Sequence, residues 1–220
     1  MLKVENIQGA YRKDYPIIKG VDISLSTGGT LGITGRNGAG KTTLIRAIVN
    51  DLPYISGRVS IAGRQIHNLS PRQLKKTGFG VFLQGGQIFP HLTILENLRM
   101  ALHDLPKNAA LTKAVAMGKN LPFFGDSKYN SIRAGNLSGG ERNLLALLMV
   151  LISEPRMLIL DEPFAGISPA NISLISNFLQ EYLDSHHASM ILVEQNQEQL
   201  KRLCQTNQVL IHGKLHPVKY

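Results

Sequence analysis

The sequence is nearly free of cysteine, and it has no apolar run long enough to cross a bilayer. Cys204 is the single cysteine among 220 residues, so the chain can form no internal disulfide, which suits a reducing compartment. The longest uninterrupted apolar run, Leu144 to Ile152, has nine residues, whereas a membrane-spanning helix needs about 20. Met1 to Glu5 carry neither an apolar signal core nor a cleavage site. These absences predict a cytoplasmic chain that does not itself form a pore.

Blocks of like charge are also missing, although the chain is basic. Its 24 Lys and Arg exceed its 15 Asp and Glu, and the formal net charge is +9. The basic residues are scattered along the chain, with no run of five or more. Such scatter is typical of a solvated surface, while attraction to an anionic membrane surface or to nucleic acid stays open.

No internal repeat or low-complexity segment interrupts the chain, and its length predicts one domain with a smaller lobe. Short apolar runs alternate with helical patterns, which predicts an α/β fold with a mainly parallel core sheet. Helices are expected over 41–50 and after Ser70-Pro71 and Ser168-Pro169, because serine caps a helix and proline suits its first position. The expected strands are 2–7, 21–25, 30–34, 59–62, 79–83, 157–160 and 190–193, with a closing hairpin over 209–218.

The segment from about 96 to 136 differs from the rest of the chain. It has no clear strand pattern and several helical stretches, and its breaks are Pro106, Gly118, Pro122 and Gly125. We therefore expect a helical subdomain at about 96–136, inserted into a catalytic core formed by residues 1–95 and 137–220.

A phosphate-binding loop is predicted at Gly35 to Thr42, which fits G-x-x-x-x-G-K-[ST] at every fixed position. The loop follows an expected strand and opens an expected helix, where glycines turn backbone N–H groups onto phosphate oxygens. Lys41 supplies a charge for the β and γ phosphates, and the Thr42 hydroxyl is placed to bind Mg²⁺. The predicted nucleotide-binding residues here are Asn37, Gly38, Ala39, Gly40, Lys41, Thr42 and Thr43.

Two adjacent acids, Asp161 and Glu162, end the apolar run that begins at Met157. Ligands of an open parallel sheet bind beyond the carboxyl ends of its strands. Asp161 is therefore predicted to face the Mg²⁺ held by Thr42, and Glu162 to orient or deprotonate the attacking water. An acidic pair at a strand end is weak evidence alone, but here it completes a nucleotide site.

The run Leu137-Ser138-Gly139-Gly140-Glu141 separates this chain from P-loop proteins in general. With the phosphate loop before it and the acidic pair after it, the sequence resembles ABC-type ATPases over nearly its full length. The resemblance implies a P-loop NTPase fold with an N-terminal antiparallel β region, and hydrolysis of ATP with Mg²⁺. It implies that Tyr11, 24 residues before Gly35, stacks on adenine. It also implies that Gln84 senses Mg²⁺ and the attacking water.

Ser138 and Glu141 have the spacing of a capping box, so a well-capped buried helix is the plainer reading of this run. Gly139 and Gly140 at a helix start also leave N–H groups open to an anion. In the family that anion is the γ-phosphate of ATP held by a second ATPase subunit. The resemblance thus implies a head-to-tail homodimer or heterodimer on the cytoplasmic face of a membrane, driving separate transmembrane subunits.

The sequence departs from the family pattern at two positions. Gln195, a predicted catalytic residue, stands where a histidine is usual. It can hydrogen-bond the γ-phosphate but cannot become cationic. Ser168 stands where an aspartate is frequent, which weakens the expected contact across the dimer. Four stretches, at 35–40, 134–137, 165–169 and 193–196, resemble the ATPases of branched-chain amino acid and urea-type importers, whose members often carry this glutamine. The alternative is a degenerate site in a heterodimer.

Other candidate features carry less weight. None of the seven histidines has metal-ligand spacing with a second candidate. They are His67, His91, His103, His186, His187, His212 and His216. The stretch Phe89 to Thr93 could meet a membrane subunit's coupling helix, or be an exposed loop. Two further functions stay open: an ABC ATPase acting on nucleic acid, which usually carries tandem cassettes or long insertions, and a slowly hydrolysing regulator, which Gln195 would suit.

Overall fold

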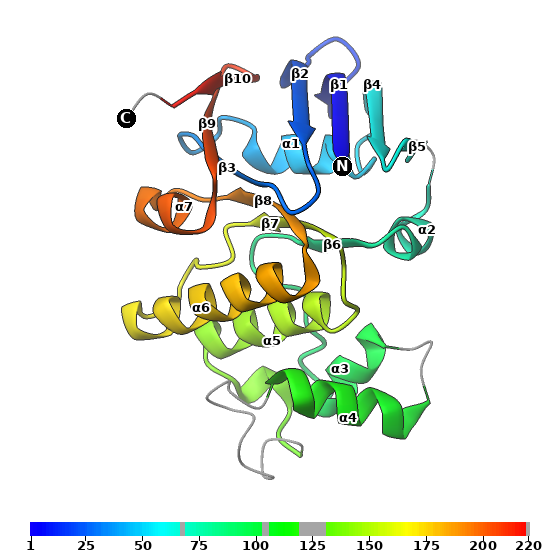
Figure 1. Cartoon of the computed structure of the whole chain (residues 1–220), viewed down its shortest axis with the longest axis vertical. Helices are drawn as coiled ribbons and strands as arrows, with labels where there is room; N and C mark the ends of the chain where they lie inside the picture. The colour runs from blue at the N-terminus through cyan, green and yellow to red at the C-terminus, as the bar shows by residue number, and fades with distance from the viewer. Residues whose placement is uncertain (67–68, 103–105, 119–130, 219–220) are drawn as a thin grey trace.

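Two β-sheets and the helices around them build the molecule, as the computed structural model shows for residues 1–66, 69–102, 106–118 and 131–218 (Figure 1). The six-stranded sheet has the order β10-β9-β3-β8-β7-β6, and the four-stranded sheet the order β2-β1-β4-β5. The strands are β1 Leu2–Ala10, β2 Ile18–Leu25, β3 Thr30–Thr34, β4 Tyr54–Ile61, β5 Arg64–Gln65, β6 Phe79–Phe82, β7 Met157–Asp161, β8 Ser189–Val193, β9 Thr206–Ile211 and β10 Lys214–Pro217. The helices are α1 Lys41–Ile48, α2 Pro71–Lys76, α3 Ile94–Ala101, α4 Lys107–Gly118, α5 Gly139–Leu151, α6 Pro169–His186 and α7 Gln197–Leu203, with a 3₁₀ turn at Ala134–Asn136.

The six-stranded sheet is parallel except for β10, which pairs antiparallel with β9. Every residue of β7 and β8 is buried, because both faces of the sheet are covered. Side chains alternate between the two faces: Leu158 and Leu160 join one core, Met157 and Ile159 the other. The predicted α/β fold with a mainly parallel core sheet is confirmed.

The four-stranded antiparallel sheet lies on one side of this arrangement, with α1 packed against both β1 and β7 (Figure 1). Leu2 and Val4 of β1 share a core with Leu44 and Ile48 of α1. The expected N-terminal antiparallel β region is therefore present.

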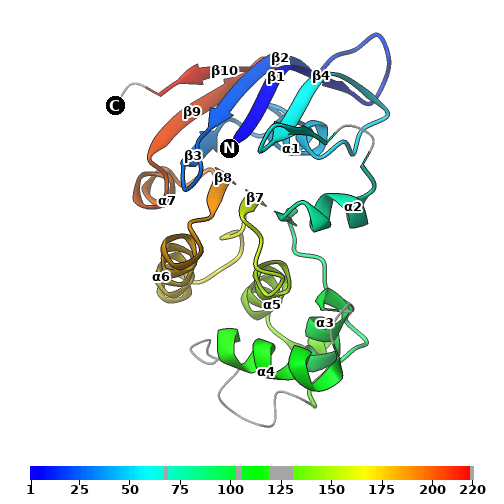
Figure 2. The same ribbon diagram turned by 45° about the vertical axis from the view of Figure 1, so that its right-hand side comes forward.

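Helices α5 and α6 cover the opposite side of the six-stranded sheet, and α3 and α4 lie beyond α5 (Figures 1 and 2). Among the described residues between 96 and 136 there is no strand, only a single bridge between Thr93 and Arg133. The helical region begins slightly earlier than expected, because Thr93 caps α3. Pro122 and Gly125, like His67 and His103, lie outside the described residues, and the division into core and subdomain stays a prediction.

The predicted helix starts at Ser70 and Ser168 are both present. Ser70 caps α2 through a capping box with Gln73, whereas Ser168 precedes α6 without a side-chain capping bond. Across the described ranges, no helix has both the length and the apolar character required to cross a bilayer.

Candidate nucleotide site

The loop between β3 and α1 has the backbone that a phosphate cradle requires. Gly38 and Gly40 have φ angles of 78° and 98°, in the left-handed region that favours glycine. A Cβ at Gly40 would lie 2.8 Å from Ile17 Cγ2, and one at Gly35 would lie 2.9 Å from the Leu210 carbonyl oxygen. The loop therefore needs glycine at these positions, and it leads directly into the N-terminus of α1.

Lys41 opens α1 with its ammonium group held inside the site. Its exposed fraction is 7%, and Nζ donates to the carbonyl oxygen of Gly35 at 3.0 Å. Nζ also lies 3.3 Å from Glu162 Oε1. A buried ammonium needs such partners, and a phosphate oxygen could take the place of either one.

Thr42 and Asp161 meet as the sequence predicts, since the Thr42 hydroxyl donates to Asp161 Oδ2 at 2.7 Å. Asp161 is 1% exposed, and its Oδ1 has no hydrogen-bond partner within the described part of the chain. Burial raises the pKa of the Asp161 carboxyl, and the charge of Glu162 raises it further. A buried, unpaired carboxylate oxygen beside a hydroxyl fits the oxygen ligands that Mg²⁺ prefers.

Glu162 is the point at which the site converges. Its Oε1 accepts from Gln195 Nε2 at 2.9 Å, and its Oε2 accepts from Gln84 Nε2 at 3.0 Å. With the ion pair to Lys41, the Glu162 carboxylate therefore contacts three other predicted site residues. Glu162 has a φ of 49°, and a non-glycine residue in this region needs support from its surroundings. Its backbone N–H donates to the Val193 carbonyl oxygen at 2.9 Å.

Glu194 also belongs to this group, although no role was predicted for it from the sequence. It is 5% exposed and comes directly after β8, and Gln195 is the next residue. Its Oε1 accepts from the backbone N–H of Phe164, and its Oε2 from that of Gln195, both at 3.1 Å. Burial raises the pKa of Glu194, while these backbone bonds oppose the rise. The available signal was a carboxylate at the end of a second apolar strand.

Tyr11 follows β1 and lies outside this cluster. Its ring is 44% exposed, and its hydroxyl accepts a long hydrogen bond from Arg46 of α1 at 3.4 Å. An exposed ring near the helix that carries the phosphate loop is available for stacking, and its contact with adenine stays a prediction.

Ser138 begins α5 with the predicted capping box. Its hydroxyl accepts from the Glu141 N–H at 3.3 Å, and Glu141 Oε2 accepts from the Ser138 N–H at 2.8 Å. A Cβ at Gly139 would meet nothing within 4 Å. Within the ranges the structure covers, no hydrogen bond joins Ser138, Gly139 or Gly140 to the phosphate loop. Helix α1, which follows the phosphate loop, and helix α5, which Ser138 caps, lie on opposite sides of the six-stranded sheet (Figures 1 and 2).

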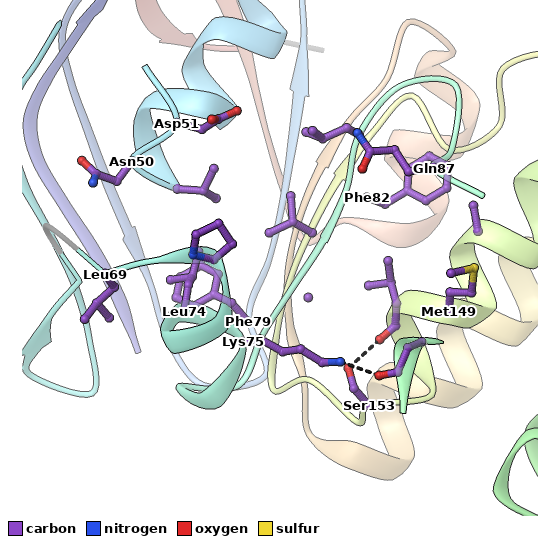
Figure 3. Close-up of a pocket in the computed structure, with 18 residues that line it drawn as sticks. Asn50, Asp51, Leu69, Leu74, Lys75, Phe79, Phe82, Gln87, Met149 and Ser153 are labelled. Atoms are coloured by element: carbon purple, nitrogen blue, oxygen red, sulfur yellow. Dashed lines mark hydrogen bonds between the residues drawn. The ribbon is translucent and has the colours of Figure 1, made fainter. Parts of the chain in front are cut away.

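A groove of about 570 Å³ lies next to the site, between α2, β6 and α5. Most of its lining is apolar, including Leu74, Phe82 and Met149, and Figure 3 shows these side chains around the groove together with Gln87. The groove and the site are neighbours along the chain, because Gln87 of the lining stands three residues after Gln84. Residues 89–93, which the sequence offered as a contact for a coupling helix, are not part of the lining, and Phe89 is 48% exposed.

The histidines do not form a metal centre in the described part of the chain, where no group of three or more His, Cys, Asp or Glu residues is placed to hold an ion. His186 instead stacks on Tyr182, with ring centroids 4.2 Å apart. The Mg²⁺ prediction rests on different atoms, namely the Thr42 hydroxyl, the Asp161 carboxylate and the Gln84 amide.

A protein-family model described as ABC transporter matches residues 18–165. The chain belongs to the ABC transporter family. It is 29% identical over 215 residues to the probable branched-chain amino acid transport ATP-binding protein LivF of Archaeoglobus fulgidus, covering 98% of this chain and 90% of the relative. It is 31% identical over 216 residues to the high-affinity branched-chain amino acid transport ATP-binding protein BraG of Pseudomonas aeruginosa, covering 98% and 91%.

The fold agrees with this membership. The ATP-binding cassette MJ1267 of an ABC transporter superposes with a TM-score of 0.84 at 29% identity, covering 98% of this chain and 89% of that one. Other ABC relatives are named for sulfate import or lipopolysaccharide export. The chain is thus an ABC transporter ATP-binding subunit, an ATP hydrolase that uses ATP and Mg²⁺.

Proposed function

We propose that this ABC ATPase powers a branched-chain amino acid importer, with the transmembrane pathway supplied by separate subunits. The similarity to LivF and BraG over nearly the whole chain supports this choice among the substrates found in the family. Two ATPase subunits would close head to tail around two ATP molecules at the cytoplasmic face of the membrane, and hydrolysis would release them.

The nucleotide would be held by both backbone and side chains. Backbone N–H groups from Asn37 to Thr43 bind the phosphates, and Lys41 moves its ammonium group from Glu162 toward the β and γ phosphates. Tyr11 stacks on the base. Thr42, Asp161 and Gln84 hold Mg²⁺, which when bound neutralises charge on the phosphate oxygens.

Glu162 would orient the attacking water and accept its proton. The observation that carries this proposal is the convergence of Gln84, Gln195 and Lys41 on its two carboxylate oxygens. Gln195 provides a neutral donor where a histidine is usual, so it orients the carboxylate without adding a positive charge.

The signature residues would act on the other subunit. Ser138, Gly139 and Gly140 begin α5, which packs on the face of the central sheet opposite α1, the helix that the phosphate loop opens. A Cβ at Gly139 would meet open space, and the N-terminus of α5 suits the γ-phosphate of an ATP molecule bound by the second subunit.

Steady-state ATP hydrolysis by the purified chain, compared with Glu162→Gln, tests this function. We expect the wild-type chain to turn over ATP, and Glu162→Gln to lose at least about a hundredfold in kcat, because an amide cannot accept the proton. The variant should also accumulate as an ATP-bound dimer in light scattering. Normal hydrolysis by a monomeric variant would contradict the proposal.

A slowly hydrolysing nucleotide switch is the second candidate, because Gln195 cannot become cationic. The same assay separates the two functions. ATP-dependent dimerisation of the wild-type chain without turnover, even with its transmembrane partners present, would favour the switch.

The groove between α2, β6 and α5 would receive a short helix from a transmembrane subunit. Its apolar lining and its link through Gln87 to Gln84 would pass movement of that helix to the nucleotide site. Met149→Glu places a charge in this lining. We expect the variant to keep its basal ATP hydrolysis but to lose co-purification with its transmembrane subunits. Unchanged co-purification would exclude the groove as the contact.

A further inference from the structure

A second buried carboxylate lies beside the proposed catalytic base, and its two oxygens contact two different parts of the chain. Glu194 Oε1 accepts from the N–H of Phe164, in the loop after β7, and Oε2 accepts from the N–H of Gln195, in the turn after β8. Among the described residues no Lys or Arg forms an ion pair with Glu194. The negative charge of Glu194 is therefore stabilised by backbone N–H donors. Burying such a charge is unfavourable in free energy for a side chain that is 5% exposed.

These contacts close a ring around Glu162. Phe164 stands two residues after Glu162, and Glu194 binds its N–H. Gln195 stands next to Glu194 and donates its side-chain amide back to Glu162 at 2.9 Å. The backbone N–H of Glu162 is bound to Val193, the residue before Glu194. A ring of this kind can hold Glu162 at its positive φ of 49°, which few non-glycine residues adopt.

We propose that Glu194 is a positioning residue for ATP hydrolysis, holding the Gln195 amide and the Glu162 carboxylate in the relative orientation that the attacking water requires. The inference rests on the proposed role of Glu162, and it adds a residue that touches neither nucleotide nor metal. Its effect should therefore appear in kcat rather than in ATP binding.

The chemistry of the two contacts explains why a carboxylate is needed. Phe164 and Gln195 both donate through backbone N–H groups, with the N–H of Asn196 as a weaker third donor, and only a carboxylate offers two acceptor oxygens to them. Glu194→Gln keeps the shape of the side chain but places an NH₂ group against one N–H group. One contact is lost, so one side of the ring becomes free to move.

The experiment measures kcat, KM for ATP and Tm for the purified full chain. We expect Glu194→Gln to lower kcat by about tenfold while KM stays within about twofold. Tyr182→Phe is the matched control, because the Tyr182 hydroxyl donates a buried hydrogen bond of 2.8 Å to Pro155, before the opposite end of β7. It should lower Tm without lowering kcat.

A double-mutant cycle separates positioning from general destabilisation. If Glu194 acts through Gln195, then Glu194→Gln should lower kcat by a much smaller factor in a Gln195→Ala chain than in the wild-type chain. Wild-type kcat in Glu194→Gln, or additive losses in the cycle, would overturn the inference while Glu162→Gln still established the proposed function. If Glu162→Gln itself hydrolyses ATP normally, both fail together.

Discussion

Buried charge is concentrated in one place in this protein. Within the described ranges, the buried Lys, Arg, Asp and Glu side chains are Lys41, Asp161, Glu162 and Glu194. All four lie near the carboxyl ends of β7 and β8 or at the start of α1. Three buried carboxyl groups thus stand against one buried ammonium group, an imbalance that favours an added cation and disfavours a bare triphosphate.

This imbalance predicts a strong dependence of nucleotide binding on Mg²⁺. Chelation with EDTA should weaken ATP binding by the wild-type chain by about tenfold or more, because the carboxylates then repel the phosphates without a metal between them. Asp161→Asn removes one of these charges, so its ATP affinity should depend less on Mg²⁺, although hydrolysis is lost. Isothermal titration with and without EDTA measures both effects.

The matched control is Asp184→Asn, at an exposed position of α6. It should respond to EDTA as the wild-type chain does. Equal ATP affinity of the wild-type chain with and without Mg²⁺ would show that the carboxylate cluster does not govern binding.

A site residue could be predicted from the sequence when its partners stand close to it along the chain. The phosphate loop was predictable because its demands are local: Gly38 and Gly40 need positive φ angles, and both stand in one contiguous motif. The contact between Glu194 and Phe164 joins residues 30 positions apart, and it exists only because β7 and β8 pair in parallel. No single-residue pattern encodes that register.

At the scale of elements, three helices start with the same capping box: α2 at Ser70, α3 at Thr93 and α5 at Ser138. The box alone is therefore a device for starting a helix. What distinguishes α5 is the glycine pair that follows its serine, with open space at Gly139.

The shared cap gives a matched pair of variants. Ser70→Ala and Ser138→Ala should each lower the free energy of unfolding by about 1 kcal/mol, because each removes one side-chain acceptor. In a Glu162→Gln chain with ATP, only Ser138→Ala should weaken the dimer seen by light scattering. Equal dimerisation of both variants at equal stability would reduce Ser138 to a helix cap.

Burial decided which elements the sequence predicted well. The expected β3 has the observed bounds, and β7 and β8 each differ from expectation by one residue at one end, since both are buried throughout. β4 starts at Tyr54 rather than at the expected 59, because its first half alternates between exposed and half-buried side chains and lacks an apolar run. The short polar helix α7 was not predicted for the same reason.

At the scale of the whole molecule, the central sheet separates two hydrophobic cores, one beside α1 and one beside α5. α1 and the antiparallel sheet lie on one side, and α5, α6 and the more distant helices on the other (Figure 2). The phosphate loop and the signature helix α5 therefore belong to different sides of one chain. This arrangement supports the head-to-tail dimer of the proposed function, in which each site combines the phosphate loop of one chain with the signature helix of the other.

Mixing two inactive variants tests this directly. Lys41→Ala disables the phosphate loop of a chain, and Ser138→Arg blocks its signature helix, so each homodimer has two defective sites. In a mixed dimer, the intact loop of the Ser138→Arg chain meets the intact signature of the Lys41→Ala chain. One complete site results, and both defects fall in the other. Random mixing at equal amounts should restore about a quarter of wild-type hydrolysis, since half of the dimers carry one of two sites.

The control mixes Lys41→Ala with Glu162→Gln, whose defects lie on the same side of the interface. Every site in that mixture contains either a defective phosphate loop or a defective base, so no activity should return. Recovery in this control would show that the phosphate loop and the base of one site come from different chains. No recovery in the first mixture, although mixed dimers form, would place the complete site within a single chain. That result would conflict with the separation of the phosphate loop and α5 by the central sheet, and the dimer would then need another explanation.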